Sequence, residues 1–136
     1  MSRGLRNCNP GNIRRSRVCY KGEKRPSRDP EFKEFESMAY GYRAMFVLLD
    51  SYRRRHGLKT IRQMLNRYAP PSENFTEGYI RFVSQRSGIA PDEELDTLSA
   101  RDMIPIVSAM SEIENGVKAV VDDVEQGWQL YKYTFK

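Results

Sequence analysis

One glutamate, Glu114, falls on the apolar face of an expected helix, where an acidic residue is unusual. Residues 99–102 have the pattern of a helix N-terminus, and Gly116 is typical of the residue that follows a helix. Apolar residues recur between them at helical spacing, at Met103, Ile106, Val107, Met110 and Ile113. At about 100° per residue, Glu114 lies roughly 40° from Met110, inside this face.

A general acid is the chemistry that this position would suit. Burial and the negative end of the helix dipole both disfavour the ionised carboxylate, so we expect the pKa of Glu114 to be raised. A carboxyl group that stays protonated near neutral pH can donate its proton to a leaving oxygen. The alternative is a partly exposed glutamate at a helix end whose side chain reaches water. Glu112 lies on the opposite side of the helix and is expected to be solvated.

Glu73 and a cluster of asparagines are further candidates. Glu73 precedes an expected helix N-terminus, where an ionised carboxylate is stabilised, and this suits a capping or orienting role. Asn7, Asn9 and Asn12 surround a turn, and they either bond the local backbone or offer amide groups to a sugar. Several tyrosines serve either core packing or stacking on sugar rings, namely Tyr20, Tyr40, Tyr42, Tyr68 and Tyr79.

Helices are expected to position these residues. The apolar spacing, with capping signals at Ser37 and Thr60 and with closing glycines, predicts helices over residues 38–56, 61–68, about 74–87, 99–115 and 117–135. Pro105 predicts that the first turn of the fourth of these helices is separate, with the helix restarting at Pro105. Residues 1–31 show no helical period, and residues 13–15 and 17–20 are expected to form a small hairpin. The fold class is therefore mainly α, with a small irregular or β-hairpin lobe near the N-terminus.

Length and composition exclude several classes of protein. The 136 residues are 39% hydrophobic and 30% charged, which fits one globular domain over residues 1–136. No apolar run approaches the ~20 residues of a membrane span. Two cysteines, Cys8 and Cys19, and one histidine, His56, make a disulfide framework or a zinc site improbable, and we interpret His56 as structural. The start of the chain has no apolar signal segment, so we expect synthesis in the cytoplasm.

Charge is distributed unevenly along the chain. Residues 1–68 carry a net charge of +11 and residues 69–136 a net charge of −6. The basic half either packs against the acidic half or attracts an anionic partner such as nucleic acid, a membrane surface or a cell-wall polymer. A nucleic-acid-binding protein would use the basic residues Arg14, Arg15, Arg17, Lys21, Lys24 and Arg25. No known reading motif accompanies them, so we do not expect a nucleic-acid partner.

The opening of the chain resembles that of a family of phage and prophage proteins that begin RGxRNNNPGNIR and are often described only as structural. Residues 3–14 here read RGLRNCNPGNIR. Cys8 stands where the family has Asn, and Tyr20 stands where it has Trp. Further matches follow in order through nearly the whole chain, at Gly22, Phe32, Phe35, residues 41–44, Thr60-Ile61, residues 67–71, residues 73–76 and residues 114–116.

The family pattern is similar to that of lysozyme-like enzymes, the lytic transglycosylases and glucosaminidases, in which a helix ends in a catalytic glutamate followed by a small residue. The resemblance implies one lysozyme-like domain with Glu114 in the catalytic position. In those enzymes the glutamate-bearing helix comes before an asparagine-containing strand, whereas here it follows residues 9–13. The domain would therefore be circularly permuted, which requires chain ends that lie close together.

The resemblance implies that peptidoglycan glycan strands are the substrate and that Glu114 protonates the glycosidic oxygen. In the lytic transglycosylase route the same residue then acts as a base while a hydroxyl of the sugar closes an anhydro ring. A hydrolytic muramidase would need a second acid, roughly 5–9.5 Å away, and Glu73 is the candidate. The residues implied to bind the substrate are Asn9, Asn12, Asn115 and Tyr68.

The resemblance implies no metal and no other cofactor. A phage enzyme without a signal segment would be associated with the virion, with other virion proteins as partners, or would be released to the periplasm by other factors. The alternative function is a non-catalytic virion or prophage protein that keeps the fold and binds glycan.

Overall fold

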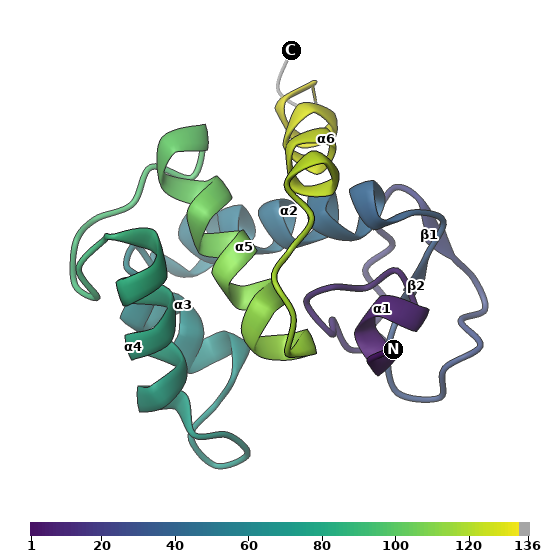
Figure 1. Cartoon of the computed structure of the whole chain (residues 1–136), viewed down its shortest axis with the longest axis horizontal. Coiled ribbons are helices and arrows are strands. Elements are labelled where there is room, and N and C mark those ends of the chain that lie inside the picture. Colours follow the sequence, from purple (N-terminus) through teal and green to yellow (C-terminus); the bar gives the residue numbers. More distant parts are fainter. Residues whose placement is uncertain (134–136) are drawn as a thin grey trace.

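The computed structural model describes residues 1–133 and is mainly helical with a two-stranded antiparallel sheet (Figure 1), which confirms the predicted fold class. None of the helices in the described residues is long and apolar enough to cross a bilayer. The last helix was predicted over residues 117–135; it begins later, at Val121, and Phe135 lies outside the described residues. The elements in chain order are α1 Arg3–Arg6, β1 Glu23–Lys24, β2 Glu34–Phe35, α2 Met38–His56, α3 Ile61–Tyr68, α4 Thr76–Ser87, α5 Ala100–Asn115 and α6 Val121–Lys132.

The boundaries of α2 and α3 follow from the predicted caps. The Ser37 hydroxyl accepts a hydrogen bond from the N–H of Tyr40, and Gly57 ends α2 in the left-handed conformation at φ 65°. The Thr60 hydroxyl accepts from the N–H of Gln63. The Gln63 side chain accepts from Lys59 instead of from Thr60, so the predicted capping box is only half formed.

Helix α4 begins later than the sequence predicted, at Thr76. The Asn74 side chain donates to the Pro70 carbonyl and does not cap the helix, and the Thr76 hydroxyl donates to the Ala69 carbonyl. Both side chains therefore hold the turn between α3 and α4 together. The turn is the segment that carries Glu73.

Helix α5 runs without interruption through Pro105, so the predicted separate first turn does not form. Proline removes one backbone hydrogen bond from the helix, whose neighbouring residues Ile106 and Val107 are buried in the core. Ser99 precedes the helix without a side-chain cap, and Gly116 ends it at φ 73°. The last turn of α5 therefore contains Glu114.

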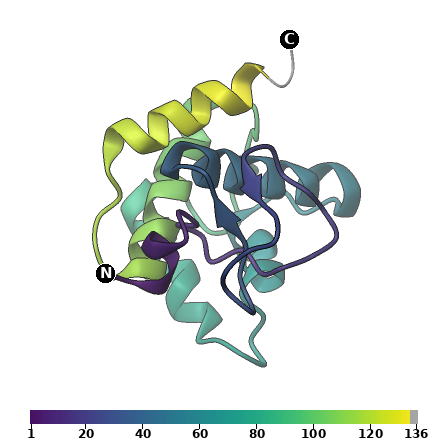
Figure 2. The same ribbon diagram turned by 90° about the vertical axis from the view of Figure 1, so that its right-hand side faces the viewer.

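The core is built around α2, which packs against α6 on one side (Figure 2). The rings of Phe46, Trp128 and Tyr131 are in mutual contact at this interface, with centroid distances of 5.0–5.6 Å. Helices α3, α4 and α5 pack in sequence beside them. Such aromatic pairs stabilise the folded state by more than the burial of their surface alone would give.

Gly127→Ala is expected to destabilise the protein, because α6 approaches α2 closely at this glycine. A Cβ atom at Gly127 would lie 2.9 Å from the Ala39 carbonyl oxygen and 2.6 Å from the Tyr42 Cβ atom. Overpacking of this kind costs about 1–3 kcal/mol, and urea unfolding followed by the fluorescence of Trp128 measures it. Gly78→Ala in α4 is the matched control, because the atoms nearest to its Cβ belong to the exposed ring of Phe75 and not to backbone. If Gly78→Ala lowered the free energy of unfolding as much as Gly127→Ala, the close approach of α6 to α2 would not be the cause of the loss.

The N-terminal lobe differs from the predicted hairpin. The two strands are formed by Glu23 opposite Phe35 and Lys24 opposite Glu34, and a single bridge pairs Arg14 with Phe32. Residues 16–18 do not form a strand because they wrap around a buried lysine. The Lys33 ammonium group donates to the carbonyls of residues 16 and 18 and to the Glu23 carboxylate.

Asn9 holds the N-terminal lobe together from the inside through hydrogen bonds to its backbone. Its side chain is fully buried, donates to the carbonyls of Ile13 and Lys33 and accepts from the N–H of Ile13. The short helix α1, which the sequence analysis missed, precedes it. Its Gly4 lies so close to the end of α5 that a Cβ atom would come within 2.5 Å of the Asn115 amide oxygen. The asparagine turn is thereby fixed beside the last turn of α5.

Candidate active site

Residues 9–12 form a tight turn whose conformation presents Asn12. Asn12 has a positive φ of 49°, which asparagine tolerates better than most residues. The Tyr68 hydroxyl at the end of α3 donates to the Gly11 carbonyl, and a Cβ atom at Gly11 would lie 2.3 Å from that hydroxyl. Glycine is therefore required at position 11, and Tyr68 holds the turn from the opposite side of the cleft.

Glu114 lies between the turn and α4. Its Oε1 atom accepts from the Asn12 amide at 2.9 Å, and its Oε2 atom accepts from the Tyr79 hydroxyl at 3.0 Å. The two donors come from segments 102 and 35 residues away in sequence. The side chain is half-buried and does not point to bulk solvent as the alternative interpretation expected.

The environment of Glu114 favours its protonated form. Burial raises the pKa of the carboxyl above its ordinary value of 4.5, and the hydrogen bonds from Asn12 and Tyr79 offset only part of that effect. Burial, together with the nearby Glu114 charge, also raises the pKa values of the Tyr68 and Tyr79 hydroxyls well above 10. Both hydroxyls therefore remain neutral donors around the acid.

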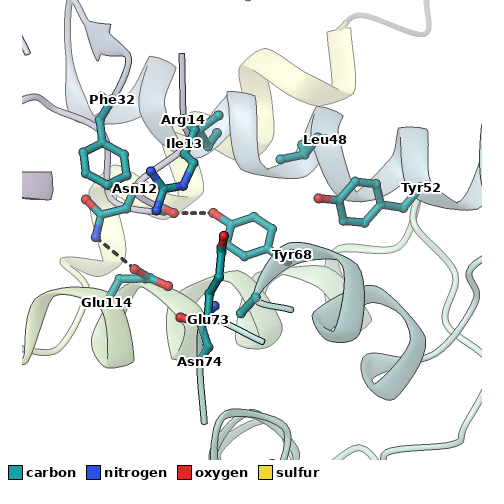
Figure 3. Close-up of a pocket in the computed structure, with 12 residues that line it drawn as sticks. Asn12, Ile13, Arg14, Phe32, Leu48, Tyr52, Tyr68, Glu73, Asn74 and Glu114 are labelled. Carbon is teal, nitrogen blue, oxygen red and sulfur yellow. Dashed lines mark hydrogen bonds between the residues drawn. The ribbon is translucent and has the colours of Figure 1, made fainter. Parts of the chain in front are cut away.

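Glu114 opens onto a cavity of 330 Å³ between the N-terminal lobe and helices α2 and α3 (Figure 3). The turn between α3 and α4 adds Glu73 to the same cavity, so the structure brings both candidate carboxylates to one cleft. Its walls otherwise combine apolar, aromatic and polar side chains. The remaining lining residues are Gly11, Asn12, Ile13, Arg14, Phe32, Leu48, Tyr52, Tyr68, Ala69 and Asn74.

The other sequence candidates divide into cleft residues and supporting residues. Asn12 and Tyr68 line the cavity, whereas Asn9 is buried behind it with its amide engaged by the backbone. Asn115 donates to the carbonyls of Pro10 and Ser111, and its oxygen accepts from the Ser2 hydroxyl. Asn9 and Asn115 therefore position the turn and offer the cleft no free amide.

The sequence analysis did not place Tyr79 against Glu114 or Arg14 in the cleft, where the structure has them. Tyr79 has an apolar position in α4, and the spacing gave no sign that its hydroxyl reaches Glu114. Arg14 follows the asparagine turn and counted only as part of a basic segment. Within residues 1–133, no three His, Cys, Asp or Glu side chains gather as metal ligands. Cys8 and Cys19 are free thiols.

Tyr79→Phe is expected to raise the pKa of Glu114 further. The substitution removes a hydrogen bond that favours the ionised form, while the burial that opposes ionisation stays. Titration of the carboxyl carbon by NMR, with the Glu114 signal assigned from its loss in Glu114→Gln, measures this directly. Tyr40→Phe is the control and should leave that titration unchanged. A downward shift in Tyr79→Phe would show that the hydroxyl does not act as a donor.

The comparison with known proteins places the chain beside a phage protein. No protein-family model matches the sequence. The chain is 36% identical over 138 residues to Protein P5 of Pseudoalteromonas phage PM2, an alignment that covers 96% of this chain and 83% of the relative. Similarity of this extent supports the phage part of the resemblance noted in the sequence. The chain therefore belongs to the family of Protein P5 of phage PM2.

Proposed function

We propose that this phage-family protein cleaves the glycan strands of peptidoglycan with Glu114 as the general acid. The observation that carries the proposal is the half-buried carboxyl of Glu114, held by Asn12 and Tyr79 at the edge of a cleft, with a raised pKa. A protonated carboxyl in such a cleft suits proton donation to a glycosidic oxygen. The chemistry needs no metal or cofactor.

The reaction proceeds by protonation of the leaving oxygen. Glu114 gives its proton to the glycosidic oxygen as the bond from that oxygen to the sugar breaks, and the carboxylate that remains can then accept a proton. In the lytic transglycosylase route it takes that proton from a hydroxyl of the same sugar, which closes the anhydro ring. In the hydrolytic route Glu73 would act as the second carboxylate across the cleft. Asn12 and Tyr68 line the cavity and are the proposed substrate contacts.

The proposal includes a fold assignment, a single lysozyme-like domain with a circularly permuted order of elements. Its support is the contact between the start of the chain and the end of α5. The Ser2 hydroxyl lies 2.7 Å from the Asn115 amide oxygen, and Asn115 also bonds the Pro10 carbonyl. The asparagine turn thus lies directly beside the end of the glutamate-bearing helix in space, although the turn comes before that helix in the sequence. Helix α6 then extends away from this junction to pack on α2.

The phage relationship suggests where the enzyme would act. We propose that the protein travels with the virion, in contact with other virion proteins, or reaches the periplasm through other phage factors. The basic N-terminal lobe would favour approach to the anionic cell wall.

Mass spectrometry of peptidoglycan incubated with the purified protein tests the proposed function. Anhydro-muramyl ends are expected if Glu114 serves as both acid and base, and reducing ends are expected if Glu73 assists hydrolysis. If the glycan binds the protein but is not degraded, the protein is a non-catalytic, glycan-binding phage protein and not an enzyme. Absence of both cleavage and binding would overturn the proposal.

A further inference from the structure

A cationic side chain accompanies the acid in the same cleft. Arg14 is the one cation among the twelve described residues that line the cavity, and Figure 3 shows it close to Asn12 and Phe32. Ile13, between Asn12 and Arg14, is buried in the core. Residues 12–14, at the end of the asparagine turn, therefore supply both a partner for Glu114 and a positive charge to the cleft.

Arg14 is held on an aromatic platform. Its guanidinium lies 5.1 Å from the centre of the Phe32 ring, and the guanidinium of Arg3 lies 4.7 Å from the same ring. The backbone of Phe32 is fixed because its N–H donates to the Asp29 carboxylate and its carbonyl accepts from the Ser27 hydroxyl. Stacking on a ring restrains an arginine without using its hydrogen-bond donors.

The charge of Arg14 is only weakly engaged by the protein. Its ionic partner is Glu31 at 3.5 Å, and the Arg14 and Glu31 side chains are 65% and 56% exposed. Exposed pairs of this kind contribute little free energy. A carboxylate that enters the cleft can therefore displace Glu31 at small cost.

We propose that Arg14 binds a carboxylate of the glycan substrate and makes the cleft select acidic muramyl glycan over a neutral amino-sugar polymer. This inference rests on the proposed function. A guanidinium binds a carboxylate through two parallel hydrogen bonds, a geometry that no neutral sugar hydroxyl reproduces. In peptidoglycan the carboxylate is carried either by the lactyl group of muramic acid or by the attached peptide.

Binding of soluble glycan strands, measured by calorimetry in the Glu114→Gln background so that no cleavage occurs, tests the proposal. Strands with free lactyl carboxylates, peptide-bearing strands and neutral chitin oligomers are compared with and without Arg14→Gln. Loss of the arginine is expected to weaken binding of at least one acidic strand by about 10- to 100-fold, the range for a hydrogen bond to a charged group. Binding of chitin oligomers should not change. The acidic strand that responds identifies which carboxylate Arg14 contacts.

Arg15→Gln is the matched control, because it removes the same charge from the next residue along the chain. The Arg15 side chain donates to the backbone carbonyls of residues 29 and 30 and does not line the cavity. An equal loss in Arg15→Gln would reduce the effect to general electrostatic attraction and overturn the proposal. An equal loss for chitin oligomers in Arg14→Gln would overturn it as well. If the unmodified protein binds acidic strands selectively but cleaves no glycan, the proposed reaction is wrong and the proposed carboxylate site at Arg14 stands.

Discussion

Glu114→Gln is expected to lower the rate of peptidoglycan cleavage by about 10²–10⁴-fold, the usual contribution of a general acid. Glutamine has the same shape, and its amide can keep contacts with Asn12 and with the rotating hydroxyl of Tyr79. What it cannot do is donate a proton and take one back. Turbidity clearing of purified cell walls measures the rate.

Glu112→Gln is the control for this result. It makes the same chemical change two residues earlier on α5, at a side chain that pairs with Arg86 outside the cleft. The control should retain the full rate of clearing. Similar rates in Glu114→Gln and the unmodified protein would remove Glu114 from the mechanism.

The pH dependence of stability separates a loss of chemistry from a loss of folding. Because burial raises the pKa of Glu114, the folded state resists its ionisation more than the unfolded state does. The free energy of unfolding therefore falls as pH rises from the ordinary value of 4.5 through the raised pKa. Glu114→Gln lacks this loss, so its melting temperature at neutral pH should equal or exceed that of the unmodified protein. Below pH 4.5 this difference should disappear. A variant that melts earlier at neutral pH would contradict the assigned pKa direction.

Local rules were sufficient for helix α2, for the end of α5 and for the position of the acid on that helix. Ser37, Gly57 and Gly116 act through the hydrogen bonds and backbone angles of their own neighbourhood, which sequence patterns record. The position of Glu114 on the apolar face of α5 is also a local property. The periodicity of that helix therefore predicted a half-buried glutamate at its end.

The partners of the acid depend on contacts that no local rule contains. Tyr79 has the spacing of an ordinary core residue, and its role arises because α4 packs against α5. The sequence analysis misplaced the hairpin because the buried ammonium of Lys33 donates to the carbonyls of residues 16 and 18, which are distant from it in sequence. Charge patterns along the chain do not show which lysine will be buried.

The role of Asn9 was also decided by distant contacts. A turn asparagine can face either a ligand or its own backbone, and the sequence left both open for Asn9 and Asn12. In the fold, Asn9 reaches the carbonyl of residue 33 and is enclosed, whereas Asn12 faces the cleft. The two side chains of one motif thus separate into one enclosed by the fold and one that lines the cleft.

Asn9→Ala is expected to destabilise the protein by about 2 kcal/mol or more. The substitution leaves the N–H of Ile13 and the carbonyl of Lys33 without their partner, and each unsatisfied buried group costs about 1–3 kcal/mol. The Ile13 carbonyl also loses a bond from Asn9 but keeps the one from the N–H of Lys33. Because domains are stable by only about 5–15 kcal/mol, the loss should be plain in urea unfolding. Asn7→Ala is the control, since its one side-chain bond, to Asp29, predicts a smaller loss.

Asn9→Asp sharpens this prediction through its pH dependence. A carboxylate can still accept from the N–H of Ile13, but it faces the carbonyl oxygens of Ile13 and Lys33, so its pKa should be raised in the folded state. The variant should therefore be less stable than Asn9→Ala at neutral pH and should recover stability as pH falls and the carboxyl gains a proton. Equal stability of Asn9→Ala, Asn9→Asp and the unmodified protein at neutral pH would show that Asn9 does not hold the turn. The placement of Asn12 against Glu114 would then need another cause.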